Sequence, residues 1–328
     1  MADTGTRSAR WRQASSCGGL LAAALIAFAW AVGPAAAAPK VVASIMPVHA
    51  LIAGVMEGVG APVLLMRRGG SPHGYSLRPS EARALSEAEL VFWIGGQLET
   101  FLARPLAALA GQARVIALSE AAEVRLLPVR RGGAWDSQGE EAGYLVDEHT
   151  EKPGGPADPH LWLDPRNAVG IARAAVAALI RVDPENADRY RRNGQGLIAG
   201  IEALDGKIAS QLASVRERPY VVFHDAYQYF ERRYALNAVG SVAVSPDRPP
   251  GARRLAEIRA RIAEVGAVCV FTEPQFRPAL VDTVISGTAT RTGVLDPLGI
   301  ALPAGPDAYF GLIRGLASSL ARCLSPGS

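Results

Sequence analysis

Residues 183–215 read DPENADRYRRNGQGLIAGIEALDGKIASQLASV and carry helical periodicity between two dissimilar halves of the chain. Asp183 is a candidate N-cap, Pro184 suits the first helical position, and Glu185 favours the positive end of the helix dipole. A helix of about 32 residues would be about 48 Å long. Glycines in its middle weaken it, so propensity alone permits a break there. A helix this long fits neither half, and we expect a stiff linking helix over 184–215.

On both sides of this stretch, short apolar runs alternate with amphipathic helical patterns, which predicts parallel sheets covered by helices. The expected strands of the first half are 41–45, 62–66, 90–94 and 114–118, with a helix over 79–89. Those of the second half are 220–223, 238–244, 267–271 and 293–295, with helices over 251–265, 278–286 and 306–323. The predicted fold class is α/β, with one lobe over 38–183 and another over 216–328.

The N-terminus has the pattern of a secretory signal peptide over 1–37. Three arginines precede an apolar run over 18–32, and a small-residue zone follows with a cleavage site after Ala37. The apolar stretch is long enough for a retained membrane anchor. Its alanine richness and the Gly33-Pro34 break favour cleavage. We therefore expect an exported protein.

Charge argues against nucleic acid as a partner. The formal net charge is +3, and removing the leader with its three arginines and one aspartate lowers it to +1. Such a balance gives no basis for binding nucleic acid or an anionic membrane. Nothing in the sequence calls for self-association, and we expect a monomer.

Export leaves Cys269 and Cys323 in an oxidising compartment. A single cysteine pair there is more often a disulfide than a metal site. Closing a loop of about 55 residues contributes about 4 kcal/mol in the chain-entropy model. We expect this bond to pin the C-terminal helix to a central strand.

The segment 131–159 is rich in glycine, proline and acidic residues and lacks periodicity, which is typical of a mobile surface loop. Its single histidine, His149, is expected to be solvated. His49 opens a helical pattern and is expected to cap it or to be partly buried.

The remaining histidines, His73, His160 and His224, each lie in a short polar break after an apolar run. Ligands of parallel α/β sheets gather beyond the C-terminal ends of the strands, and His224 and Asp296 both follow predicted strands directly. Three imidazoles and one carboxylate suit tetrahedral zinc. The alternatives are histidines that only form loop hydrogen bonds, and an Asp296 that only holds an Asp-Pro turn.

Five blocks of sequence resemble the metal-type solute-binding proteins of ABC importers, and most of all their periplasmic zinc branch, the ZnuA type. The blocks are Ser71-Pro-His-Gly-Tyr-Ser-Leu-Arg-Pro-Ser80, His160-Leu-Trp-Leu-Asp164, Phe223-His-Asp-Ala-Tyr-Gln-Tyr229, Phe271-Thr-Glu-Pro-Gln-Phe-Arg-Pro278 and Leu295-Asp-Pro-Leu-Gly299. The similarity runs in order from about Val41 to Cys323.

This resemblance implies two lobes joined by a long rigid helix, with Zn2+ held as transported ligand in the interlobe cleft and passed to a membrane permease. It implies that His73, His160 and His224 are ligands. Manganese relatives carry a carboxylate where this chain has His224, and carboxylate-rich sites suit manganese better. The cysteine pair also matches a disulfide of similar proteins.

The fourth ligand varies in this family among water, a loop carboxylate and the aspartate that matches Asp296. We assign Asp296, with water as the competitor. The loop over 131–159 departs from the family because it is acidic, whereas the zinc branch often has many histidines there.

Asp225 and Glu273 are candidates to orient the free ring nitrogens of the ligand histidines. Trp162 and Tyr227 are expected to be packing residues near the cleft. The rival functions are a manganese-type importer component, a secreted zinc hydrolase and a surface adhesin. A hydrolase needs an open metal position and a general base, and no recognisable base motif accompanies the histidines. We therefore expect a binding protein without enzymatic activity.

Overall fold

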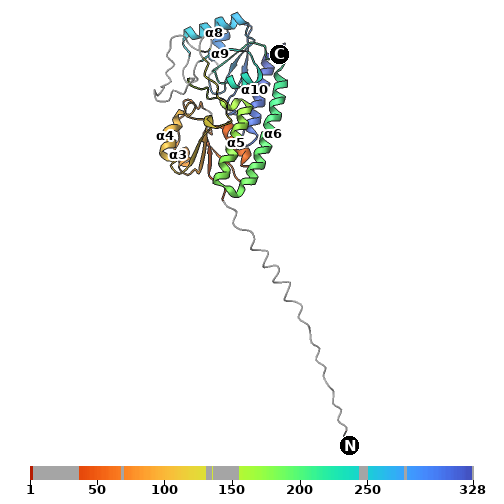
Figure 1. The fold of residues 1–328 in the computed structure, drawn as a ribbon. Coiled ribbons are helices and arrows are strands. Elements are labelled where there is room, and N and C mark those ends of the chain that lie inside the picture. The colour runs from red at the N-terminus through yellow and green to blue at the C-terminus, as the bar shows by residue number, and fades with distance from the viewer. Residues whose placement is uncertain are drawn as a thin grey trace. The chain divides into compact units, whose positions relative to one another are not determined.

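A computed structural model describes residues 1–2, 37–67, 70–130, 135, 155–243, 250–276 and 279–326. By its internal contacts the chain divides into Met1–Ala37 and Ala38–Ser328, and the fold described here is that of the second unit (Figure 1). The expected signal peptide and most of the expected loop over 131–159, with His149, lie outside the described residues. No helix in the described ranges is long and apolar enough to cross a bilayer.

The first sheet has four parallel strands in the order β2-β1-β3-β4. These strands are β1 (Val41–Ala43), β2 (Val63–Leu64), β3 (Leu90–Trp93) and β4 (Arg114–Ala117). The helices of this half are α2 (Met46–Val55), α3 (Pro79–Ser86) and α4 (Thr100–Leu109), and a 3-10 turn, η1 (Leu118–Glu120), follows β4. All three residues of β1 are buried, as expected for a strand covered on both faces.

The second sheet repeats this order, β6-β5-β7-β8, again with parallel strands only. Its strands are β5 (Tyr220–Val222), β6 (Ala238–Ser241), β7 (Cys269–Thr272) and β8 (Arg291–Val294). Its helices are α7 (Gln228–Tyr234), α8 (Ala252–Val265), α9 (Ala279–Ile285) and α10 (Ala308–Leu324). The predicted α/β class with two parallel sheets is confirmed, and each of the eight expected strands overlaps an observed one.

The segment between the sheets differs from the expected single helix. A 3-10 turn, η4 (Pro184–Asn186), precedes α6 (Ala187–Leu212), so the long helix has 26 residues. A further helix of 18 residues, α5 (Pro165–Val182), precedes it and lies beside it (Figure 1). The Asp183 side chain does not cap the backbone as expected. Its carboxylate accepts hydrogen bonds from Asn186 Nδ2 and Tyr190 Oη, which holds the turn between the two helices.

Helix α6 continues through its glycines. Two of these glycines lie where another helix approaches closely. A Cβ on Gly194 would lie 2.5 Å from Val176 Cγ2 of α5, and one on Gly200 would lie 3.1 Å from Phe310 of α10. A Cβ on Gly196 would meet nothing within 4 Å. At Gly194 a larger residue would force α5 to shift, and at Gly200 it would crowd the Phe310 ring.

The two halves share one hydrophobic core. Helix α2 is buried from Pro47 to Val55, and it contacts α5, α6 and α10, so a helix of the C-terminal half packs on a helix of the N-terminal half. A helix that is apolar on all sides is typical of such an interior position. One continuous cluster of buried side chains includes Phe92 of β3, Phe271 of β7 and Tyr309 of α10. This core fixes the two sheets relative to each other.

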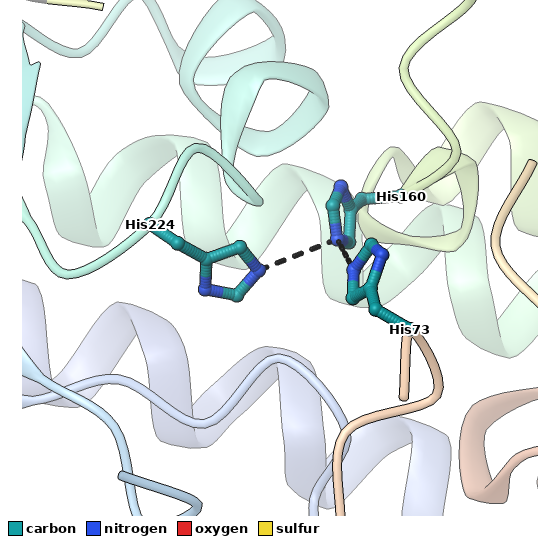
Figure 2. Close-up of side chains that lie close together, drawn as sticks. All are labelled: His73, His160 and His224. Carbon is teal, nitrogen blue, oxygen red and sulfur yellow. Dashed lines mark hydrogen bonds between the residues drawn. The ribbon is translucent and has the colours of Figure 1, made fainter. Parts of the chain in front are cut away.

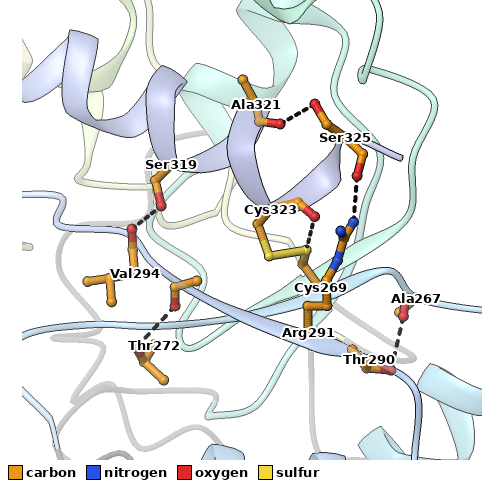
Figure 3. The surroundings of a disulfide bond; sticks show 11 residues. Ala267, Cys269, Thr272, Thr290, Arg291, Val294, Ser319, Ala321, Cys323 and Ser325 are labelled. Carbon is orange, nitrogen blue, oxygen red and sulfur yellow. Dashed lines mark hydrogen bonds between the residues drawn. A yellow bond between two sulfur atoms is a disulfide. The ribbon is translucent and has the colours of Figure 1, made fainter. Parts of the chain in front are cut away.

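The expected disulfide between Cys269 and Cys323 is confirmed, with 6.2 Å between the two Cα atoms (Figure 3). It joins the start of β7 to the last turn of α10. Nearby, the Arg291 guanidinium donates to Ser325 O and Ser319 Oγ donates to Val294 O. These contacts hold the C-terminal helix against the second sheet, as the position of the cysteines predicts.

Candidate metal centre

His224 lies two residues after the end of β5 and is 5% exposed. Its Nδ1 lies 2.6 Å from Glu273 Oε1, and Glu273 follows the neighbouring strand β7. Adjacent parallel strands end at the same edge of a sheet, so this pair follows directly from the topology. Because a carboxylate oxygen accepts, Nδ1 carries the proton and Nε2 of His224 is left with a lone pair.

His160 is held in the same way by a residue of its own loop. Its Nδ1 lies 2.8 Å from Asp158 Oδ1, and its backbone N–H donates to the same oxygen. Asp158 is in turn fixed by its backbone, because its carbonyl accepts from Tyr229 Oη of α7 and its N–H donates to Leu127 O. The buried carboxylate therefore directs Nε2 of His160 away from the loop.

His73 lies in the loop between β2 and α3 and is half-buried. Its backbone N–H donates to Ser71 Oγ, and its ring reaches the other two. The Nε2 of His160 lies 3.2 Å from Nε2 of His73 and 3.4 Å from Nε2 of His224. Figure 2 shows the three rings turned toward one another.

This spacing matches a tetrahedral metal site. With Zn–N bonds of about 2.0–2.1 Å, two nitrogen ligands of a tetrahedral zinc lie about 3.3–3.4 Å apart. The ligand atoms of His73, His160 and His224 all lie within 4.8 Å of one another, and they form a group that could hold a metal ion. Lone pairs that converge in this way attract a positive charge, which a metal ion or a proton can supply.

Burial lowers the pKa of His73 and of His160 well below the usual value, and the neighbouring imidazoles lower it further. Burial also opposes the charged form of His224, but the charge and hydrogen bond of Glu273, together with the charges of Asp225 and Asp158, outweigh it and raise the pKa of His224. Metal ligation requires neutral imidazoles. His73 and His160 are therefore neutral and available to a metal at neutral pH.

Asp296 follows β8, as expected, but its carboxylate is bound within its own turn. Oδ1 accepts from the N–H groups of Leu298 and Gly299, and Oδ2 accepts from that of Ile300, at 2.8–3.0 Å. Among the described residues, the group of possible ligands around the histidines does not include Asp296. The structure thus brings the three predicted histidines together and gives Asp296 the contacts of the alternative, an Asp-Pro turn.

Of the two residues expected to orient the histidine rings, one does so and the other does not. Glu273 binds a histidine nitrogen as predicted, but Asp225 does not, because both of its oxygens accept from the Arg130 guanidinium. The sequence interpretation missed Asp158 as the partner of His160. Its place two residues before the histidine in Asp-Pro-His was the available signal.

Trp162 and Tyr227 are packing residues, as predicted. Both are buried, and they donate to the carbonyls of Pro297 and Leu295. His49 is buried in α2 with Nε2 3.1 Å from Pro62 O, which agrees with its expected structural role.

Two parallel α/β sheets with a shared helical core and three converging imidazoles define a metal-binding member of the two-lobed solute-binding class. The chain belongs to the family described as zinc-uptake complex component A periplasmic, ZnuA, whose family model matches residues 41–323. The resemblance inferred from the five sequence blocks is confirmed.

Curated relatives cover nearly the same span. The high-affinity zinc uptake system protein ZnuA of Brucella suis biovar 1 is 42% identical over 305 residues, which cover 87% of this chain and 91% of that protein. The protein of the same description from Yersinia pestis is 36% identical over 88% of this chain and 92% of its own length.

Solved structures agree with the fold. A crystal structure of ZnuA aligns with a TM-score of 0.71 and 25% identity over 88% of this chain and all of that one. The periplasmic zinc binding protein TroA from Treponema pallidum aligns with a TM-score of 0.72 and 22% identity over 88% of this chain and 99% of that one, which is evidence of a shared fold.

Proposed function

We propose that this protein captures Zn2+ outside the cytoplasmic membrane with His73, His160 and His224 and delivers it to the permease of an ABC importer. The observation that carries the proposal is the set of Nε2 contacts at 3.2 and 3.4 Å, close to the nitrogen spacing of tetrahedral zinc. The zinc-uptake names of relatives up to 42% identical supply the transport context.

The donor set favours zinc over manganese. All three ligand atoms of the group are imidazole nitrogens, which suit zinc, whereas carboxylate and water ligands suit manganese. Asp296 would have to give up three backbone hydrogen bonds to become a fourth ligand. Asp296 as a ligand stays a prediction, and water is the fourth ligand that leaves these bonds intact.

The rival reading, a zinc hydrolase, lacks support from the carboxylates next to the histidines. Asp158 and Glu273 are both buried and each accepts from a histidine Nδ1, which is the contact of a residue that orients a metal ligand. The family is one of solute-binding transport proteins. Binding without catalysis is therefore the proposed activity.

A periplasmic location is part of the proposal. The disulfide between Cys269 and Cys323 suits an oxidising compartment. We propose cleavage after Ala37, lobes over 38–183 and 216–328 joined at 184–215, and a monomer as the mature form. N-terminal sequencing and light scattering of the exported protein check the cleavage site and the monomer.

Equilibrium zinc binding to the purified mature protein tests the function. We expect one zinc per chain, a large loss of affinity in His224→Ala, and no hydrolysis of model esters or peptides. His49→Ala is the matched control, because His49 is a buried histidine outside the group. Full affinity in His224→Ala, or equal losses in the two variants, would show that the site is assigned wrongly.

A further inference from the structure

Gln275 lies in the turn after β7, two residues beyond Glu273. It lines the same small pocket as the three histidines, and the pocket wall beside it is completed by Phe276. The sequence block Phe271-Thr-Glu-Pro-Gln-Phe contains this glutamine, but neither the ligand set nor the packing accounts for a polar side chain there.

The amide of Gln275 is oriented by Asp296. Gln275 Nε2 lies 3.4 Å from Asp296 Oδ1, and that carboxylate is itself held by the backbone N–H groups of its turn. Because carboxylate oxygens accept hydrogen bonds, the NH2 end of the amide must face Asp296 and the oxygen must face the other way. The orientation follows from the partner and does not depend on how the two ends of the amide are assigned.

The oxygen of this amide has no partner among the described protein atoms. Gln275 Oε1 is buried and accepts no hydrogen bond from any of them. A buried acceptor without a donor is costly, and native structures pair such groups with protein, water or a ligand. Among the residues that line the pocket, Gln275 Oε1 and Glu273 Oε2 are therefore buried acceptors without a described donor, and Gln275 is the one whose side chain does not hold a histidine.

We propose that Gln275 Oε1 accepts a hydrogen bond from the water that fills the fourth position of a zinc ion bound by the three histidines. This inference rests on the proposed function. Zinc with three protein ligands commonly keeps a water in its fourth position. The ion lowers the pKa of that water, which makes it a strong hydrogen-bond donor.

The proposal gives Asp296 an indirect role. Its carboxylate keeps the backbone hydrogen bonds of its turn and positions Gln275, and Gln275 in turn holds the fourth ligand. A neutral amide can hold the water without adding a negative charge to the site. A carboxylate at the same place would bind the cation more strongly and hinder its release to a permease.

The test compares Gln275→Leu with wild-type protein in zinc competition titrations against a chelator. We expect zinc affinity to fall about tenfold with stoichiometry unchanged, because one hydrogen bond to the bound water is lost. Gln228→Leu is the matched control, since Gln228 also has a buried Oε1 without a described partner but does not line this pocket. An affinity of Gln275→Leu equal to that of Gln228→Leu would overturn the proposal.

A crystal structure of the zinc-loaded wild-type protein tests the same point without relying on the folding of a variant. We expect an oxygen bound to zinc within about 2.6–3.2 Å of Gln275 Oε1. Asp296 in the fourth position, or Gln275 turned away from it, would overturn the inference while leaving zinc capture intact. Different results would contradict the proposed function itself. These are absent zinc binding in the wild-type protein, or full affinity in His224→Ala.

Discussion

The Nδ1 nitrogens of His160 and His224 each face a buried carboxylate, and this pairing determines which nitrogen each ring offers to a metal. Asp158 and Glu273 accept from Nδ1, so both Nε2 atoms point into the shared pocket. Such partners typically tune metal affinity by 10–100-fold.

Glu273→Ala removes one of these partners. We expect zinc affinity to fall about 10–100-fold with stoichiometry retained, because the His224 ring loses its fixed tautomer and orientation. Competition titration measures the loss, and Glu99→Gln, a change at a buried glutamate outside the pocket, is the control. Unchanged affinity in Glu273→Ala would contradict the orienting role.

Glu99 makes a separate contribution to the pH dependence of stability. Its carboxyl contacts Ser44 Oγ and the N–H groups of Ile94 and Gly95, and burial raises its pKa to about 7 from a usual value of 4.5. The folded state therefore holds its proton more tightly than the unfolded state. The contribution of Glu99 to the free energy of unfolding therefore falls as pH rises from about 4.5 to about 7.

Glu99→Gln removes this titration. The free energy of unfolding of wild type, relative to that of the variant, should fall by about 3 kcal/mol between pH 4.5 and 7.5. Urea denaturation at a series of pH values measures the difference, in which the contributions of other buried carboxyls cancel. A difference that is flat with pH would contradict the raised pKa.

At the residue scale, the sequence identified the three histidines because each has a distinctive neighbourhood and follows an apolar run. Asp158 lies two residues before His160, which is a signal in the sequence, but residue types alone do not show that its carboxylate contacts the ring instead of facing solvent. The contacts of Asp296 with Leu298, Gly299 and Ile300 likewise depend on the geometry of the turn, which residue types alone leave open.

At the element scale, α5 and α6 approach closely along their length, and glycine makes this possible at one position. A Cβ on Gly194 would lie 2.5 Å from Val176 Cγ2, whereas one on Gly196 would meet nothing. The two positions are two residues apart in one helix and differ in what faces them.

Gly194→Ala should lower the free energy of unfolding by about 1–3 kcal/mol, because α5 and α6 must move apart or repack. Gly196→Ala should raise it by up to about 1 kcal/mol, since alanine has the higher helix propensity and no clash. Chemical denaturation of the two variants measures both changes. Equal effects would mean that helix propensity and not packing determines these positions.

Strands and helices were predictable to different extents. The eight strands were found because each is a short apolar run bounded by polar or turn residues, and their ends differ from expectation by only a few residues. Helix α5 was not anticipated. Helix α6 was, and it begins and ends inside the expected range 184–215. Its glycines suggested a break because the sequence does not reveal what packs on them.

At the scale of the whole molecule, the disulfide and the shared core hold the second sheet and α10 together. Cys269 and Cys323 are 54 residues apart in sequence, so the bond restricts a large loop of the unfolded chain. The two-lobed arrangement was predictable from the repeated strand and helix pattern. The burial of α2 against α5, α6 and α10 was not, because it depends on contacts between segments far apart in sequence.

The double variant Cys269→Ala/Cys323→Ala should lose about 4 kcal/mol of unfolding free energy, through the added freedom of the unfolded chain. Zinc stoichiometry should remain at one, since neither cysteine lines the pocket. Urea denaturation and zinc titration measure the two quantities. Loss of zinc binding in a folded double variant would mean that the disulfide shapes the site.

We propose above that one zinc ion binds between His73, His160 and His224. The most direct measurement is an anomalous difference map collected at the zinc absorption edge from crystals of the zinc-loaded protein. We expect a single strong peak about 2.0–2.1 Å from the Nε2 atom of each of the three histidines. A strong peak elsewhere, or a peak bound by fewer than three of these nitrogens, would contradict it.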